Sequence, residues 1–331
     1  MRLPLVATLF TLQACAGQHR VPVSMEPAPA VRQERTVEIT YRVTVPEWPG
    51  SAERLDLFLP VPAEGDNQVL VEQQIDSNLE GRIVRDPVHG NRAWHGQAMG
   101  PVSEAIWVEG RFEVRRLEAA ATSSDPAESI ERYLEPSALV PVGEDVEVLA
   151  PILAEIREST GPGGGMQKAR AIYDWVVDNM EYKKVGTGWG NGDTFWGCTE
   201  RYGNCTDFHS VFLSLARTEG IPARFHMGFP LPEGTGPTTL GGYHCWVEFY
   251  LPEAGWVPID ASEAAKYPEQ REAYFGQGRL DRVRFSTGRD IRLGEGHRSG
   301  ALNYLIYPHA EVDGVAYDDL EREVRFREIG E

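Results

Sequence analysis

The stretch that decides the fold reads Gly203-Asn204-Cys205-Thr206-Asp207-Phe208-His209-Ser210-Val211-Phe212-Leu213-Ser214-Leu215-Ala216. Behind Cys205 the apolar side chains recur at helical spacing, at Phe208, Val211, Phe212 and Leu215. We therefore expect Cys205 at the start of a helix that runs into the core. The first turn of a helix carries unpaired N–H groups and a partial positive charge, which lower a thiol's pKa. An inert buried cysteine is the alternative, and the Gly-Asn break before Cys205 argues against it.

A second stretch indicates partners for this thiol. The run Gly242-Tyr243-His244-Cys245-Trp246-Val247-Glu248-Phe249-Tyr250 alternates and is rich in aromatic residues, as a strand is. A turn leads to Trp256-Val257-Pro258-Ile259-Asp260, so the two runs predict a hairpin that brings His244 beside Asp260. A histidine can pair with a thiolate and protonate a leaving group, and a carboxylate fixes the tautomer of the imidazole. We predict Cys205 as nucleophile, His244 as general base and acid, and Asp260 as the orienting residue.

These blocks resemble the three signature blocks of the transglutaminase-like superfamily, whose bacterial branch is described as transglutaminase-like cysteine peptidases. The resemblance spans residues 140–315 and includes Gly220-Ile221-Pro222-Ala223-Arg224, Arg289-Asp290-Ile291 and the run from Leu302 to Gly314. It implies a papain-like core, in which a nucleophile helix packs on an antiparallel sheet, with the three residues in the roles given above. It leaves the substrate open, because the superfamily includes transferases, proteases, deglycosylating enzymes and inactive members.

The residues before this core follow a period of two. Val37, Ile39, Tyr41, Val43 and Val45 alternate with polar residues, and shorter candidates follow at 55–59, 69–71, 83–84, 93–95 and 106–114. Several short strands within about 80 residues predict an antiparallel sandwich of immunoglobulin-like size. We therefore predict an α+β protein: an N-terminal antiparallel β-sandwich at 36–118, a transglutaminase-like catalytic domain at 138–315 and a C-terminal tail at 316–331.

Helical spacing in the second half begins near Pro151, which suits a first turn, and recurs from Ala169 to Met180. The glycine-rich segment Gly186–Gly192 lacks the Lys-Ser/Thr ending of a phosphate-binding loop. We interpret it as a mobile loop.

The N-terminus is typical of a targeting segment. Arg2 precedes an apolar run from Leu3 to Leu12, and Leu12-Gln13-Ala14-Cys15 ends it. This order resembles a bacterial lipoprotein signal, which implies cleavage and lipidation at Cys15; the start of a buried helix is the alternative. Residues 16–35 are rich in Pro, Ala and Gln and are interpreted as a tether. We expect an exported, lipid-anchored protein of the cell envelope.

The charge of the chain restricts its partners. Among 331 residues, Lys and Arg total 32 and Asp and Glu total 50, a formal net charge of −18. Long-range repulsion argues against nucleic acid and against an anionic membrane surface. We expect a peptide or protein substrate, contact with a membrane only through the lipid anchor, and no cofactor.

Several further residues are candidates for the site. Trp189 or Tyr182 could supply an oxyanion donor beside the backbone N–H of Cys205, with core packing as the alternative. A disulfide between Cys198 and Cys245 is expected because Cys245 should face away from His244 on its strand, and two free thiols are the alternative. A zinc site from both of these cysteines with Cys205 and His244 is disfavoured by their spacing, so no metal is expected.

The expected reaction is acyl transfer through a thioester on Cys205. An open glycine-rich rim admits water, which outnumbers any amine, so we predict hydrolysis of peptide or amide bonds. The alternatives are a transglutaminase that forms amide crosslinks with an amine acceptor and a non-catalytic binding module that keeps the fold.

Overall fold

A computed structural model describes residues 33–118, 129–234 and 236–329. The expected signal peptide, the lipidation site Cys15 and nearly all of the tether lie outside the described residues. Among the residues that are described, no helix has both the length and the apolar character that a membrane crossing requires.

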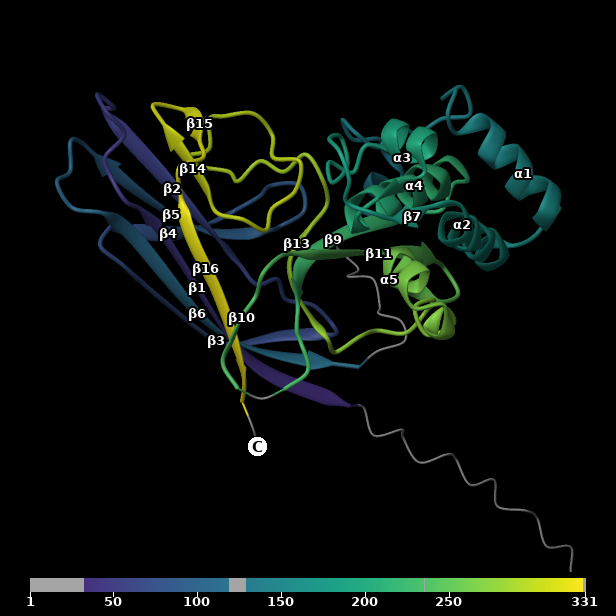
Figure 1. Ribbon diagram of the computed structural model, residues 1–331, viewed down its shortest axis with the longest axis horizontal. Coiled ribbons are helices and arrows are strands. Elements are labelled where there is room, and N and C mark those ends of the chain that lie inside the picture. Colours follow the sequence, from purple (N-terminus) through teal and green to yellow (C-terminus); the bar gives the residue numbers. More distant parts are fainter. Residues whose placement is uncertain (1–32, 119–128, 235, 330–331) are drawn as a thin grey trace, which may run out of the picture. The chain divides into compact units, whose positions relative to one another are not determined.

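The six strands expected at the N-terminus are confirmed (Figure 1). They are β1 (Glu34–Val45), β2 (Arg54–Val61), β3 (Gln68–Ser77), β4 (Gly81–Arg85), β5 (Arg92–Met99) and β6 (Ile106–Leu117). Every second side chain of β1 from Val37 to Val45 is buried, as the period of two requires. These strands supply most of two antiparallel five-stranded sheets, so the predicted sheet-rich N-terminal region is confirmed.

The C-terminal segment completes these two sheets, which differs from the tail expected at 316–331. Strands β14 (His309–Val312) and β15 (Val315–Tyr317) extend one sheet, in the order β15-β14-β2-β5-β4. Strands β10 (Thr238–Thr239) and β16 (Glu321–Glu328) extend the other, in the order β10-β16-β1-β6-β3. On β16, Val324 pairs with Tyr41 and Phe326 with Ile39, and both β16 side chains are buried. The charged residues that flank them obscured this short pattern in the sequence.

The second half of the chain forms the helical and sheet elements of the core. The helices are α1 (Ala150–Thr160), α2 (Gly165–Asn179), α3 (Thr194–Glu200), α4 (Cys205–Thr218) and α5 (Ala261–Lys266), with short 3₁₀ turns η1 (Glu131–Leu134) and η2 (Pro268–Gln270). The sheet has the order β12-β11-β9-β13, from β9 (Ala223–Pro230), β11 (His244–Leu251), β12 (Gly255–Ile259) and β13 (Arg282–Thr287). A short parallel pair joins β7 (Glu181–Tyr182) to β8 (Tyr202–Gly203).

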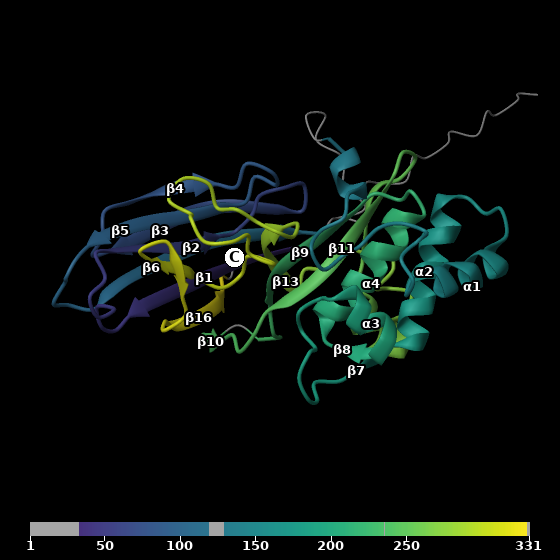
Figure 2. The same ribbon diagram turned by 90° about the horizontal axis from the view of Figure 1, so that it is seen from above.

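Helix α4 lies against this sheet, as Figure 2 shows from above. Phe212 of α4 meets Phe249 of β11 with ring centroids 6.3 Å apart. Strands β11 and β12 form the predicted hairpin, in which Val247 pairs with Ile259. The α+β class and the helix-on-sheet core are therefore confirmed.

Aromatic side chains join the sandwich to the core. Tyr41 of β1 packs edge-on against Phe229 and Phe285, at 5.8 and 6.2 Å between ring centroids, and Phe112 of β6 packs edge-on against Phe285 at 6.4 Å. Gln68 adds polar contacts, since its amide donates to the Arg284 carbonyl at 2.7 Å and accepts from the Arg284 N–H at 2.8 Å. The two regions share one buried apolar cluster.

Candidate active site

The local sequence makes α4 begin at Cys205. Asn204 is the N-cap, and its side-chain oxygen accepts the Thr206 N–H at 2.9 Å. The Asp207 carboxylate in turn accepts the Asn204 N–H at 2.9 Å, which completes a capping box. The thiol of Cys205 therefore stands in the first turn, where the helix dipole favours a negative charge. Cys205 is 2% exposed, so the thiol lies in a nearly closed site.

The hairpin brings His244 and Asp260 together. His244 is the first residue of β11, and Asp260 directly follows the last residue of β12. The His244 Nε2 lies 2.6 Å from Oδ2 of Asp260. Asp260 is also the N-cap of α5, because its Oδ1 accepts the Glu263 N–H at 3.0 Å. One buried carboxylate thus orients the imidazole and starts a helix.

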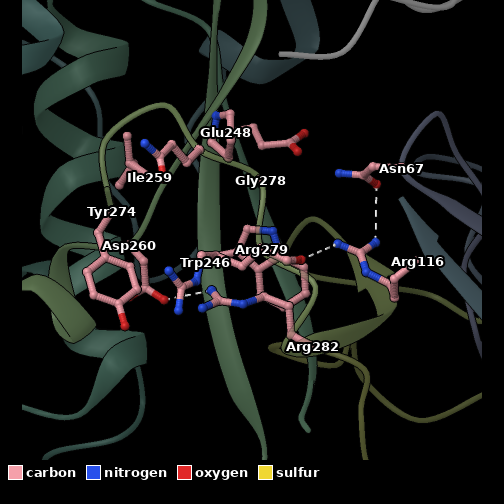
Figure 3. Close-up of a pocket in the computed structure, with 12 residues that line it drawn as sticks. Asn67, Arg116, Trp246, Glu248, Ile259, Asp260, Tyr274, Gly278, Arg279 and Arg282 are labelled. Atoms are coloured by element: carbon pink, nitrogen blue, oxygen red, sulfur yellow. Dashed lines mark hydrogen bonds and ion pairs between the residues drawn. The ribbon is translucent and has the colours of Figure 1, made fainter. Parts of the chain in front are cut away.

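Arg282 of β13 holds this carboxylate from a third element. Its Nη1 donates to Oδ2 of Asp260 at 2.7 Å, and Figure 3 shows the two side chains together near Trp246. Burial raises the pKa of Asp260, but the positive charges of His244 and Arg282 outweigh it and hold the pKa well below the usual range. Asp260 therefore remains ionised beside His244.

The charges of the site favour a thiolate–imidazolium pair. A hydrogen bond from Cys245 and another from His244 lower the pKa of Cys205 well below its usual range, against the effect of burial. Burial lowers the pKa of His244, but the Asp260 carboxylate and the Cys205 sulfur outweigh it and raise the pKa to about 9. At neutral pH, Cys205 is then an anion and His244 a cation.

Cys245 lies inside the site, and the expected bridge to Cys198 is not formed. Cys198, Cys205 and Cys245 are all buried free thiols. Alternation separates neighbouring side chains within a strand, but His244 is at the strand end, so both residues reach Cys205. Cys245, Val247 and Phe249 are alternate residues of β11 and share the face that packs against α4. This alternation in the sequence could have predicted that Cys245 lies on the same side as Cys205.

His209 is a second residue whose place the sequence did not show. It follows Cys205 by one helical turn, and its Nδ1 lies 3.4 Å from the Cys245 Sγ. Its Nε2 lies 3.6 Å from Oδ1 of Asp260. Burial lowers the pKa of His209 to about 4, so the ring is neutral at physiological pH. His209 therefore lies close to both the second thiol and the Asp260 carboxylate.

The candidate oxyanion residues lie in different surroundings. Burial, with the charge of Cys205 as the next cause, raises the pKa of Tyr182, so this phenol keeps its proton. Its ring lies 6.1 Å from the Phe208 ring between centroids. The Trp189 indole N–H donates to the Gly186 carbonyl at 3.1 Å within its own loop. The Trp189 N–H is thus already paired within its loop, whereas the Tyr182 hydroxyl has a proton to donate.

The glycine-rich segment is anchored, which differs from the mobile loop that we expected. Asp207 accepts the Gly190 N–H at 2.7 Å and the Gly192 N–H at 3.0 Å, in addition to its capping bond. Gly192 has φ +63°, and a Cβ there would lie 2.8 Å from an Arg289 nitrogen. A side chain at this position would therefore strain both the backbone and the contact with Arg289.

The cavity behind Asp260 is not the substrate cleft. It lies between the core and the sandwich, with Asp260 and Arg282 on one wall and Arg116 on the other (Figure 3). Arg116 donates to the Arg279 carbonyl across it at 2.9 Å. The cavity volume is about 20 Å³, which suffices for about one water molecule and for no peptide side chain.

One cluster of possible metal ligands is present in the part of the chain that the structure describes. His297, His309 and Glu311 place ligand atoms within 4.8 Å of one another. However, the His297 Nδ1 accepts the Leu293 N–H at 3.0 Å, so the neutral ring carries its proton on Nε2, the atom that would face a metal. Nε2 instead lies 3.2 Å from the Ser299 hydroxyl. The His309 Nε2 lies 3.0 Å from the same hydroxyl and 3.2 Å from the Glu311 carboxylate, so the cluster forms a hydrogen-bond network.

Comparisons with known proteins agree with this core. An uncharacterized protein of Haemophilus influenzae is 27% identical over 319 residues, with a coverage of 83% of this chain and 85% of that protein. YebA of Bacillus subtilis, also uncharacterized, is 33% identical over 79 residues, with a coverage of 21% of this chain and 11% of that protein. A Cytophaga hutchinsonii structure described as a "putative cysteine protease" has a TM-score of 0.58 at 16% identity, covering 90% of this chain and 92% of that chain.

The likeness to the Cytophaga structure is one of fold, since the identity is low. A family model matches the region that contains Cys205, His244 and Asp260. Residues 152–261 match the model of the transglutaminase-like superfamily, and this chain therefore carries a transglutaminase-like core.

Proposed function

We propose that the protein is a thiol enzyme that transfers acyl groups through Cys205, His244 and Asp260. The observation that carries the proposal is the 2.6 Å contact between His244 and Asp260 beside a cysteine at a helix start. A histidine locked by a carboxylate next to a thiolate is the arrangement that nucleophilic acyl transfer requires.

The proposed reaction follows from the charges of the site. The Cys205 thiolate attacks the carbonyl carbon of a peptide or carboxamide, and the N–H of Cys205 and the Tyr182 hydroxyl stabilise the oxyanion. His244 then gives its proton to the leaving nitrogen as the thioester forms. In the second half, neutral His244 takes a proton from the acceptor that attacks the thioester. Asp260 keeps the imidazole in one orientation throughout.

We propose water as the acceptor. A transglutaminase needs bulky aromatic walls that admit an amine and exclude water. Trp196 and Trp246 are bulky enough for such walls, but other contacts hold them. Trp196 donates to the Tyr202 carbonyl at 3.1 Å, and Trp246 packs on His226 and Arg282 and stacks on His244 at 6.4 Å between ring centroids. These contacts support hydrolysis of peptide or amide bonds over crosslinking.

The test is incubation with a library of glutamine-containing peptides and a fluorescent primary amine. We expect cleaved or deamidated peptide with little amine incorporated, and no product from the Cys205→Ala variant. Efficient amine incorporation would show a transglutaminase. If the wild type and Cys205→Ala remain equally inactive on all peptides, the binding module is the better account.

We also propose that the protein is exported and attached to the cell envelope by lipid on Cys15. The support is the sequence of residues 1–15, with its charge, apolar run and terminal cysteine. Mass analysis of the protein from its native host should find an N-terminus at lipidated Cys15. Recovery of a chain that begins at Met1 from the cytoplasm would contradict the proposal.

A further inference from the structure

The Asp260 carboxylate serves two histidines, and each histidine faces a cysteine. Through Oδ2 it contacts the Nε2 of His244 at 2.6 Å, and His244 pairs with Cys205. Through Oδ1 it lies 3.6 Å from the Nε2 of His209, whose Nδ1 lies 3.4 Å from the Cys245 Sγ. The site therefore contains a second Cys–His pair that the acyl-transfer reaction does not use.

The two thiols are neighbours within this arrangement. His209 stands one turn beyond Cys205 on α4, so a sulfur in contact with His209 lies beside the start of the helix. The Cys245 Sγ lies 3.4 Å from the His209 Nδ1, and a hydrogen bond from Cys245 is the first cause of the low pKa of Cys205, so the two thiols are close enough to interact. Both side chains are buried, at 2% and 0% exposure, so a small oxidant is favoured over a bulky one.

We propose that Cys245 is a resolving thiol and that Cys205 and Cys245 form a reversible disulfide in response to a hydroperoxide. In the first step the Cys205 thiolate attacks one peroxide oxygen, the O–O bond breaks, and hydroxide leaves and is protonated to water. Cys205 is then a sulfenic acid. The peroxide supplies the oxidising equivalents for the whole reaction.

In the second step the Cys245 sulfur attacks the sulfenic sulfur of Cys205. The S–S bond forms, the S–O bond breaks, and the hydroxide that leaves is protonated to a second water. In sum, two thiols lose two electrons and one hydrogen peroxide becomes two waters. A dithiol reverses the step by exchange and restores the nucleophile.

His209 supplies the base that the second step needs. Cys245 is a poor nucleophile at rest, because burial, together with the adjacent Cys205 sulfur, raises its pKa well above the usual range. The low pKa of about 4 keeps the His209 ring neutral. A neutral ring with its proton on Nε2, toward Asp260, leaves Nδ1 as an acceptor for the Cys245 proton. Oxidation of Cys205 also removes the negative sulfur that holds this proton in place.

Cys198 offers a matched control within the same chain. It is buried like the other two, but it lies on α3, and burial raises its pKa to about 12 with Arg201 and Asp193 as its charged neighbours. A general oxidation of buried thiols would reach Cys198 as well, whereas the resolving mechanism leaves it reduced.

Peptide mapping can separate the three thiols. Trypsin cuts after Lys184, Arg201, Arg217, Arg224 and Lys266, which places Cys198, Cys205 and Cys245 on peptides 185–201, 202–217 and 225–266. The reduced full-length protein is treated with equimolar hydrogen peroxide, alkylated and digested without reductant. We expect peptide 202–217 linked to 225–266, with 185–201 alkylated. Treatment with dithiothreitol should release the link.

Variants test the role of Cys245 directly. For the variants the peroxide is raised to several equivalents, because the path from thiolate to sulfinic acid consumes two peroxides. In Cys245→Ser, this dose should carry Cys205 on to sulfinic acid, and the reactivity recovered with dithiothreitol should fall to about a tenth of the value for wild type treated in the same way, because sulfinic acid resists dithiols. Cys198→Ser should behave as the wild type. Thermal unfolding checks that each variant is folded. The peptide map of the wild-type protein tests the Cys205–Cys245 link even if a variant fails to fold.

Equal recovery in Cys245→Ser and the wild type would overturn the proposal, and so would a link that includes Cys198. The readout is thiol chemistry, so it does not depend on finding a substrate. A disulfide found without peptide hydrolysis would support this inference while the proposed function fails.

Discussion

At the residue scale, the pairing of Cys205 with His244 sets the reactivity of the thiol. With its pKa well below the usual range, Cys205 is a thiolate throughout the neutral region, whereas burial raises the pKa of Cys198 and of Cys245. Cys205 should therefore react fastest with iodoacetamide at pH 7, as followed by peptide mapping. Its rate should change by less than about threefold between pH 6 and 8, whereas an unperturbed thiol would change by about 75-fold.

His244 allows a second test of the reactivity of Cys205. His244 is a cation below a pKa of about 9, so its pairing with Cys205 is present at neutral pH and is lost as the pH rises through that value. Replacement in His244→Ala should slow alkylation of Cys205 by about tenfold or more at pH 7, since each unit of thiol pKa changes the thiolate fraction tenfold. His89→Ala, in the β4–β5 turn, is the matched control. Preferential labelling of Cys198 or Cys245 would show that the nucleophile is misassigned.

At the scale of elements, Asp207 connects helix α4 to the glycine-rich loop. Its carboxylate accepts the N–H groups of Asn204, Gly190 and Gly192 at 2.7 to 3.0 Å. Asp207→Ala leaves these donors unpaired, so unfolding by denaturant should show a loss of about 3 kcal/mol. Hydrogen exchange at Gly190 and Gly192 should become faster. Asp193→Ala, which removes only the cap of α3, should cost about 1 kcal/mol.

The same comparison can contradict this account. If Asp207→Ala were no less stable than Asp193→Ala, or if the exchange at Gly190 and Gly192 were unchanged, the carboxylate would not anchor the loop. The position of Cys205 would then depend on the helix alone.

At the scale of the whole described molecule, the sandwich and the core share their apolar interior. Phe285 of β13 is fully buried between Tyr41 and Phe112 of the sandwich and Phe229 of the core. Phe285→Ala should cost about 3–5 kcal/mol, as large buried rings do. Because the Phe285 ring packs against both regions, calorimetry of Phe285→Ala should show a single unfolding transition at a lower temperature than in the wild type. Phe195 is 44% exposed, so Phe195→Ala should change stability by less than about 0.5 kcal/mol.

Two separate transitions, of which Phe285→Ala shifts only one, would show that the regions unfold independently. The aromatic contacts between the sheets would then contribute little to stability. A single transition would mean that damage to the sandwich also reaches the site at Cys205.

Local patterns in the sequence were sufficient for much of the fold. The helix start at Cys205 follows from a break and an apolar stripe, and the hairpin of β11 and β12 follows from alternation around a turn. The six N-terminal strands were found in the same way. These features depend on residues that are close in the sequence, where side-chain period and turn chemistry decide the structure.

By itself, the sequence determined the α+β class, the helix that begins at Cys205 and the hairpin that brings His244 and Asp260 together. Only the tertiary structure decided that residues 321–328 pair with β1, that Cys245 and His209 meet beside Cys205, and that Asp207 anchors the loop. These contacts join residues that are distant in the chain, or depend on which way a side chain turns at the end of a strand. Periodicity describes one element at a time, whereas packing between elements chooses their partners.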